Sequence, residues 1–161
     1  MERLTRELNL EKAAHFLGHR TDVPALWSMA SVGVLCSTAE GLSNAVIEGM
    51  AGRVPMAVTS AGGNPELVAH RQRGLVVPPL QPFELSAAIG WLIENQRTAR
   101  RMGQAGRRFV EEHLTLRQLV ENHDQLYRRV VGRSEGIEGR PERADRASAE
   151  LQEDPLLSEA L

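Results

Sequence analysis

The stretch AEGLSNAVIEGMAGRVP, residues 39–55, places two glutamates, Glu40 and Glu48, eight positions apart. Two neighbouring carboxylates can work as a general acid and a general base, or they can accept hydrogen bonds from the hydroxyl groups of a ligand. Glu40 stands beside a glycine in a predicted loop. Glu48 falls inside an apolar run, where burial of a carboxylate would be costly. Both acids are therefore candidate site residues.

Between the two acids the sequence predicts the start of a helix over residues 43–51, for which Ser43 or Asn44 is a good N-cap. The free N–H groups near Leu42, Ser43, Asn44 and Ala45 would form an anion site, and Gly41 would let a ligand approach the backbone. An anion flanked by two carboxylates that bind hydroxyl groups matches a nucleotide-sugar, which consists of sugar, diphosphate and ribose. The alternative interpretation makes Glu40 a loop acid and Glu48 a helix residue facing solvent.

Apolar segments rich in β-branched residues alternate with helical segments up to about residue 132. Strands are predicted at 14–18, 31–37, 56–60 and 74–79, and the longer helices at 43–51, 83–95, 97–112 and 115–131. Asp22 is expected to cap a short helix over 23–30, with Pro24 in its first turn. A short helix is also expected at LVAH, residues 67–70, after a loop at 61–66.

This alternation predicts an α/β fold, a partial Rossmann-like domain in which about four parallel strands are covered by helices on both faces. Ligands of such sheets bind at the carboxyl ends of the strands. Two loops follow strands there, TAEGLSN (38–44) and SAGGNPE (60–66). The second loop adds Gly62, Gly63 and Glu66 to the candidate residues.

Composition limits the other functions. The chain has 161 residues, 42% of them apolar, a net charge of −2 and a single cysteine, Cys36. These values fit one globular domain without an internal disulfide, and they give no sign of a nucleic-acid partner. We expect a cytoplasmic protein, with peripheral association at the inner membrane face as an alternative. Residues 133–161 contain four arginines and eight acids and are predicted to form a mostly disordered tail after a domain over 1–132.

The order of motifs resembles the C-terminal donor-binding domain of group 1 (family 4) retaining glycosyltransferases of the GT-B fold. The resemblance covers about residues 8–130 and rests on motifs that occur in the family's order and spacing: FLG (16–18), DVP (22–24), EGL (40–42) followed by Glu48, EGMA (48–51), VP (54–55), GGNPE (62–66) and GLVVPP (74–79).

The resemblance implies a role for each matching position. Glu40 would contact the donor sugar near the reacting centre, and Glu48 would bind the ribose. Gly41, Leu42, Ser43 and the helix start at Asn44 would hold the diphosphate and sugar hydroxyls. The donor would be a UDP- or GDP-linked sugar, the acceptor a sugar, lipid or small molecule, and neither a metal nor another cofactor would be needed. Glu48 would then face the ligand cleft.

The chain also departs from the family's pattern. Arg53 stands where the family has a glycine that suits a left-handed helix end, so either Arg53 strains the turn or Gly52 takes over this role. The N-terminal domain and the opening strands of the C-terminal domain have no counterpart, so we expect an N-terminally truncated remnant with an exposed, apolar sheet edge that favours association. We therefore expect a hexosyltransferase-like protein that transfers sugar with retention as part of a complete enzyme. The alternative is a non-catalytic nucleotide-sugar-binding or protein-interaction module.

Overall fold

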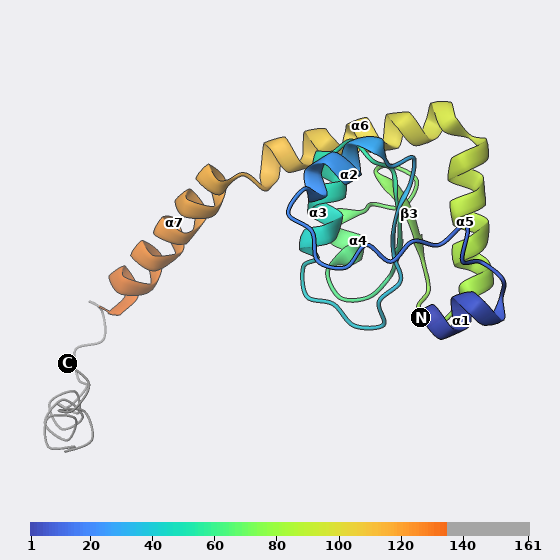
Figure 1. The fold of residues 1–161 in the computed structure, drawn as a ribbon. Helices are drawn as coiled ribbons and strands as arrows, with labels where there is room; N and C mark the ends of the chain where they lie inside the picture. The colour runs from blue at the N-terminus through green and yellow to red at the C-terminus, as the bar shows by residue number, and fades with distance from the viewer. Residues whose placement is uncertain (135–161) are drawn as a thin grey trace, which may run out of the picture. The chain divides into compact units, whose positions relative to one another are not determined.

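The computed structural model describes residues 1–134, and the predictions for the tail beyond residue 134 lie outside the described residues. The described residues divide into two units, one over 1–115 and one that begins at Leu116, and each is described by itself (Figure 1). The first unit contains three strands and six helices: β1 (Gly33–Leu35), β2 (Met56–Thr59), β3 (Gly74–Val77), α1 (Glu2–Glu7), α2 (Val23–Met29), α3 (Asn44–Ala51), α4 (Asn64–Leu67), α5 (Pro82–Glu94) and α6 (Gln96–His113).

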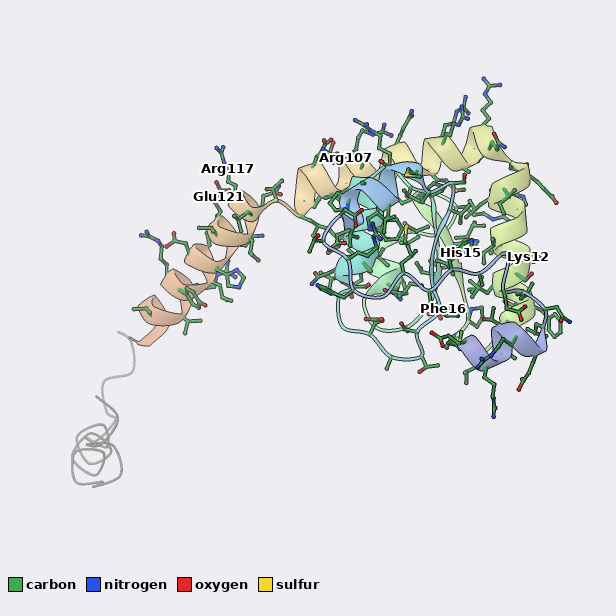
Figure 2. All side chains as sticks on the ribbon, in the orientation of Figure 1. Lys12, His15, Phe16, Arg107, Arg117 and Glu121 are labelled. Atoms are coloured by element: carbon green, nitrogen blue, oxygen red, sulfur yellow. The ribbon has the colours of Figure 1, made fainter. Side chains whose placement is uncertain are left out.

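The three strands form a parallel sheet in the order β1-β2-β3, which confirms the predicted α/β class. The expected strand at 14–18 is wrong, because these residues form no strand and the sheet has three strands where about four were expected. Phe16 and Leu17 are instead about half exposed, on the segment after α1 (Figure 2). The physical reason is that a short apolar run becomes a strand only where a neighbouring strand can pair with it, and none lies beside this run among residues 1–134.

Helices cover both faces of the sheet. On one face, Val46 and Met50 of α3 pack against Met56 and Val58 of β2. On the other face, the side chain of Ala57 lies in a second core cluster. The other members of this cluster come from β3, α5 and α6: Leu75, Val77, Ala88, Leu92, Ala99 and Met102. Alternate residues of β2 thus face opposite layers, as expected for a parallel strand buried on both sides.

Helix α6 passes across the amino end of the sheet. Its Gly103 lies so close to the turn before β2 that a β-carbon there would overlap the carbonyl oxygen of Arg53. One turn further along α6, Arg107 (Figure 2) donates a hydrogen bond from Nη1 to the carbonyl oxygen of Ala51, at 2.6 Å. The turn between α3 and β2 is therefore held directly against the backbone of α6.

The turn between α3 and β2 shows which residue takes the left-handed conformation where the family has a glycine. Arg53 itself adopts a left-handed conformation with φ of 62°, whereas Gly52 has φ of −75°. Gly52 therefore does not take over the role of the family's glycine. A residue with a β-carbon pays about 1–2 kcal/mol for this conformation, so the turn stores strain at Arg53.

Three local features differ from the sequence-based expectations. Asp22 precedes α2 but makes no capping bond; its carboxylate accepts two hydrogen bonds from Arg20, at 2.6 and 2.7 Å, which lower the pKa of Asp22. The short helix expected at 67–70 is wrong in its bounds: α4 spans Asn64–Leu67, beginning inside the segment expected as a loop, because Pro65 suits its first turn, and residues 68–70 are not helical. The helix α1 was not predicted.

The second unit is described through α7 (Leu116–Ser134). The expected helix over 115–131 is confirmed. Its apolar residues, which recur at helical spacing, are exposed: Leu116, Leu119, Val120, Leu126, Tyr127 and Val130. Among the residues that the structure describes, no helix is both long and apolar enough to span a membrane.

Candidate functional site

The loops after β1 and β2 meet at the carboxyl end of the sheet. The N–H group of Gly63 donates a hydrogen bond to the carbonyl oxygen of Gly41, at 2.8 Å. Gly62 has φ of +51°, and a β-carbon on it would overlap the carbonyl oxygen of Glu40. The close approach of the two loops therefore requires glycine at position 62. The structure thus brings together the two loops that the sequence singled out.

The side chain of Glu40 is oriented by the ends of two strands. Ser37 Oγ donates a hydrogen bond to Glu40 Oε1 at 2.6 Å, and Thr59 Oγ1 donates one to the carbonyl oxygen of Ser37 at 2.6 Å. This chain of hydrogen bonds links the last residue of β2 to the half-buried carboxylate. The sequence-based prediction missed Ser37 and Thr59. A usable signal was that Ser37 is the last residue of the strand predicted at 31–37 and Thr59 the next to last of the strand predicted at 56–60.

The start of α3 presents free backbone donors. Ser43 is the N-cap, 6% exposed, and its Oγ accepts a hydrogen bond from the N–H group of Val46 at 3.4 Å. Such a cap contributes about 1 kcal/mol to stability. The N–H groups of Leu42, Ser43, Asn44 and Ala45 have no acceptor among residues 1–134. This helix start therefore has donors, and the positive end of a helix dipole, available for an anion.

Glu48 lies on the solvent side of α3. The neighbouring Val46 and Met50 point into the core, whereas Glu48 is exposed and forms no ion pair within the described part of the chain. The rise per residue of a helix places it about 6 Å along α3 from Asn44. The apolar residues around Glu48 in the sequence thus do not bury its carboxylate.

The second loop leads into α4, where Gly62, Gly63 and Glu66 occupy the turn and the helix. Glu66 is exposed, and its carbonyl oxygen accepts a hydrogen bond from Arg73 Nη2 at 3.0 Å. Arg73 also lies over the ring of Phe109, at 3.9 Å from the ring centre, and burial lowers the pKa of its guanidinium. Arg73 therefore fixes the end of α4 to α6.

Asn64 is the buried polar residue of the second loop. It is 0% exposed, and its Nδ2 donates a hydrogen bond to the carbonyl oxygen of Thr59 at 3.1 Å. Its Oδ1 has no partner among residues 1–134. Within the same residues, no three His, Cys, Asp or Glu side chains come together in a way that could hold a metal ion. The polar groups at this end of the sheet are thus hydroxyls, amides and the carboxylates of Glu40, Glu48 and Glu66.

A family model described as "Glycosyl transferases group 1" matches residues 1–109, which include both loops, the whole sheet and most of α6. The chain belongs to this glycosyltransferase family. Its similarity to curated members extends further along the chain: it is 30% identical over 135 residues to the MMP alpha-(1->4)-mannosyltransferase of Mycolicibacterium hassiacum. It is 27% identical over 128 residues to the N-acetyl-alpha-D-glucosaminyl L-malate synthase of Bacillus anthracis.

Solved glycosyltransferase structures have the same fold. A sucrose-phosphate synthase from Thermosynechococcus elongatus superposes with a TM-score of 0.77 and 29% identity, over 81% of this chain and 33% of that one. HepE from Anabaena, solved in complex with UDP-glucose, superposes with a TM-score of 0.72 and 25% identity, over 77% of this chain and 35% of that one. The sheet and its helices are thus part of a GT-B glycosyltransferase fold.

The match covers a limited part of each relative. The two curated glycosyltransferases are covered over 33% and 34% of their length, and 82% and 80% of this chain takes part. The chain thus spans about a third of the length of these relatives.

Proposed function

We propose that the two joined loops bind a nucleotide-diphosphate sugar, and that this site serves sugar transfer with retention in a complete GT-B enzyme. The observation that carries the proposal is the open start of α3, with Glu40 before it and Glu48 exposed beyond it. Hydroxyl-binding carboxylates on both sides of a helix start match a ligand with a diphosphate between two polyols. The complex of the relative HepE with UDP-glucose supports this class of ligand.

Each group has a distinct role in this proposal. The diphosphate accepts hydrogen bonds from the free N–H groups at Leu42, Ser43 and Asn44, where the helix dipole favours negative charge. Glu40, oriented by Ser37, accepts hydrogen bonds from the donor sugar next to the reacting carbon. Glu48 accepts hydrogen bonds from the ribose.

The same arrangement bears on the chemistry of transfer. When the bond between sugar and diphosphate breaks, negative charge develops on the departing phosphate. Backbone donors that already point at the phosphate stabilise this charge without reorganisation. We therefore expect that transfer requires no metal ion. The expected donor is a UDP- or GDP-linked sugar.

Glu48→Gln tests the donor site. We expect the full chain to bind UDP-glucose or GDP-mannose in titration calorimetry, and the variant to bind at least tenfold more weakly, because a hydrogen bond to a charged group contributes about 1.5–3 kcal/mol. Glu11→Gln is the matched control, since it removes the same charge from an exposed residue outside both loops. A folded chain that binds no UDP-, GDP- or ADP-sugar, or equal affinities for the two variants, would refute the proposal.

The outer edge of β1 favours a second element of the proposal, association with further protein. Val34 is 42% exposed, and β1 pairs only with β2 among the described residues. Strands of parallel sheets are normally covered and flanked. We propose that this edge joins the sheet to the remainder of a glycosyltransferase, in the same chain or in another. The amides of β1 should then exchange hydrogen faster than those of β2 in the chain alone; equal protection would contradict an open edge.

A further inference from the structure

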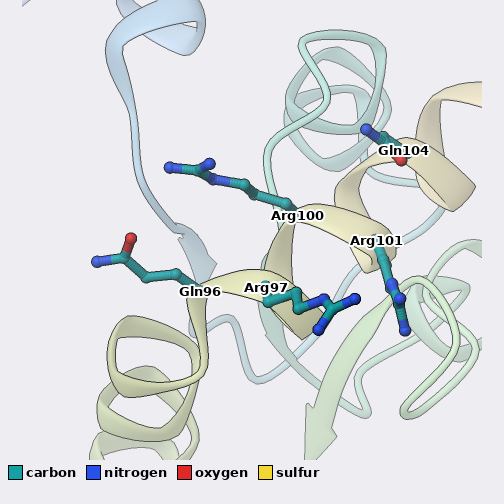
Figure 3. Close-up of a pocket in the computed structure, with 5 residues that line it drawn as sticks. All are labelled: Gln96, Arg97, Arg100, Arg101 and Gln104. Carbon is teal, nitrogen blue, oxygen red and sulfur yellow. The ribbon is translucent and has the colours of Figure 1, made fainter.

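Two adjoining depressions lie at the amino end of the sheet, opposite the donor loops. The larger, of about 520 Å³, is lined by residues from the first half of α6: Gln96, Arg97, Arg100, Arg101 and Gln104 (Figure 3). The smaller, of about 320 Å³, shares Gln96 and Arg100 and adds Arg53 and Pro55 from the turn before β2. We refer to Arg53, Arg97, Arg100 and Arg101 as the arginine cluster.

The arginine cluster is not neutralised by the protein. None of its four guanidinium groups has a hydrogen-bond or ion-pair partner among residues 1–134. Four other arginines among the described residues do pair with an acid, among them Arg3 with Glu7 and Arg107 with Glu111, one helical turn away. The sequence from Asn95 to Val110 contains no acid, and the neighbouring Glu94 lines neither depression. Like charges are thus concentrated here without compensation.

The position of these charges is unfavourable without a counter-ion. Arg97, Arg100 and Arg101 lie in the first two turns of α6, near the positive end of the helix dipole, and no acid is present in its first turn. In Figure 3, Arg97 and Arg101 extend to one side of the helix, and Arg100 extends to the other together with Gln96. A bound anion would relieve the repulsion among these groups.

Arg53 provides an independent argument. Its left-handed backbone is the conformation that glycine adopts without strain, yet an arginine occupies the position. The contact of its carbonyl oxygen with Gly103 fixes the residue beside the turn of α6 that carries Arg100. Strain that is retained in this way is typical of positions whose side chain has a function.

We propose that the arginine cluster binds a ligand with two or more phosphate charges. Guanidinium groups match phosphate oxygens through paired hydrogen bonds, and four of them around two connected depressions exceed what a single phosphate can occupy. The cluster lies before β2 and the donor loops lie after it, so one strand of four residues, about 13 Å, separates the two sites. A soluble diphosphate and the headgroups of anionic phospholipids share this chemistry.

The test uses the full chain and two probes at low salt. Inorganic pyrophosphate is titrated by calorimetry, and vesicles of phosphatidylglycerol and phosphatidylcholine are compared with pure phosphatidylcholine vesicles in a sedimentation assay. We expect the variant Arg97→Gln/Arg100→Gln to lose at least tenfold in affinity for the probe that binds. Arg117→Gln/Arg129→Gln on α7 is the matched control with the same change in net charge, and it should change affinity less than twofold.

Each outcome decides the proposal. Loss of pyrophosphate binding in the first variant assigns a soluble ligand, and loss of vesicle binding assigns a lipid headgroup. Binding of neither probe to the unaltered chain, or equal losses in both double variants, overturns the proposal, provided that circular dichroism shows folded protein. Glu48→Gln leaves the arginine cluster intact, so failure here is separate from failure of the donor site.

Discussion

Gly103→Ala is expected to lower the free energy of unfolding by about 3 kcal/mol, the upper range for overpacking a well-packed contact. The new β-carbon would overlap the carbonyl oxygen of Arg53, with the carbonyl carbon of Arg53 and the nitrogen of Pro55 close behind. These are backbone atoms, so no side chain can rotate to make room. Either α6 moves away from the sheet or the turn before β2 shifts, and both changes disturb the two core clusters. Urea unfolding followed by circular dichroism measures the effect.

Gly90→Ala is the control for this substitution. Gly90 also lies inside a helix, α5, but a β-carbon there meets nothing within 4 Å. Alanine should therefore stabilise the chain slightly, by about 0.5–1 kcal/mol, because glycine is a poor helix former. If the two variants had the same stability, the close packing of α6 on the turn would not exist in solution.

Gly62→Ala is expected to destabilise the chain by about 2–4 kcal/mol and to weaken nucleotide-sugar binding at least tenfold. The left-handed conformation accounts for about 1–2 kcal/mol, and the overlap with the carbonyl oxygen of Glu40 accounts for the rest. To relieve the overlap, the two loops must separate, which moves Glu40 away from the start of α3. Urea unfolding and donor calorimetry report the two effects.

Gly41→Ala separates these effects from a general sensitivity of the loops. A β-carbon on Gly41 has no neighbour within 4 Å, and the residue has no left-handed φ. The free energy of unfolding of the Gly41→Ala variant should therefore remain within about 0.5 kcal/mol of that of the unaltered chain, as for most exposed positions. Equal losses of stability in the two variants would contradict the role of Gly62 in joining the loops.

The elements around the site were predictable from the sequence because their signals are local. The N-cap at Ser43 and the strands beginning near Gly33, Met56 and Gly74 follow from capping preference and apolar runs. The segment at 14–18 shows the limit of this approach. Its apolar residues resemble those of a strand, but pairing depends on a neighbour that no local pattern can supply.

Within the site, the outward orientation of Glu48 was expected from the family resemblance, although the apolar residues around it alone suggested a costly position. Val46 and Met50 take the buried positions of α3, and Glu48 is exposed. The orientation of Glu40 was not predictable. The orientation of Glu40 depends on Ser37, and that of Ser37 on Thr59, which is distant in the sequence. The strained turn at Arg53 likewise depends on how α6 packs against it.

The strand order β1-β2-β3 has a consequence for folding kinetics. Gly33 pairs with Met56 and Met56 with Gly74, so each strand meets the next one in the chain across roughly twenty residues, a separation with a modest entropic cost of loop closure. Pairing of parallel strands is still slower than hairpin formation, because each crossover must be closed before its two strands can pair. The rate at which the three-stranded sheet forms within one molecule should be independent of protein concentration. The rate of pairing between molecules along the outer edge of β1 should instead rise with concentration, because that process is second order. Refolding rates measured at several protein concentrations would therefore distinguish folding of the sheet from association of molecules.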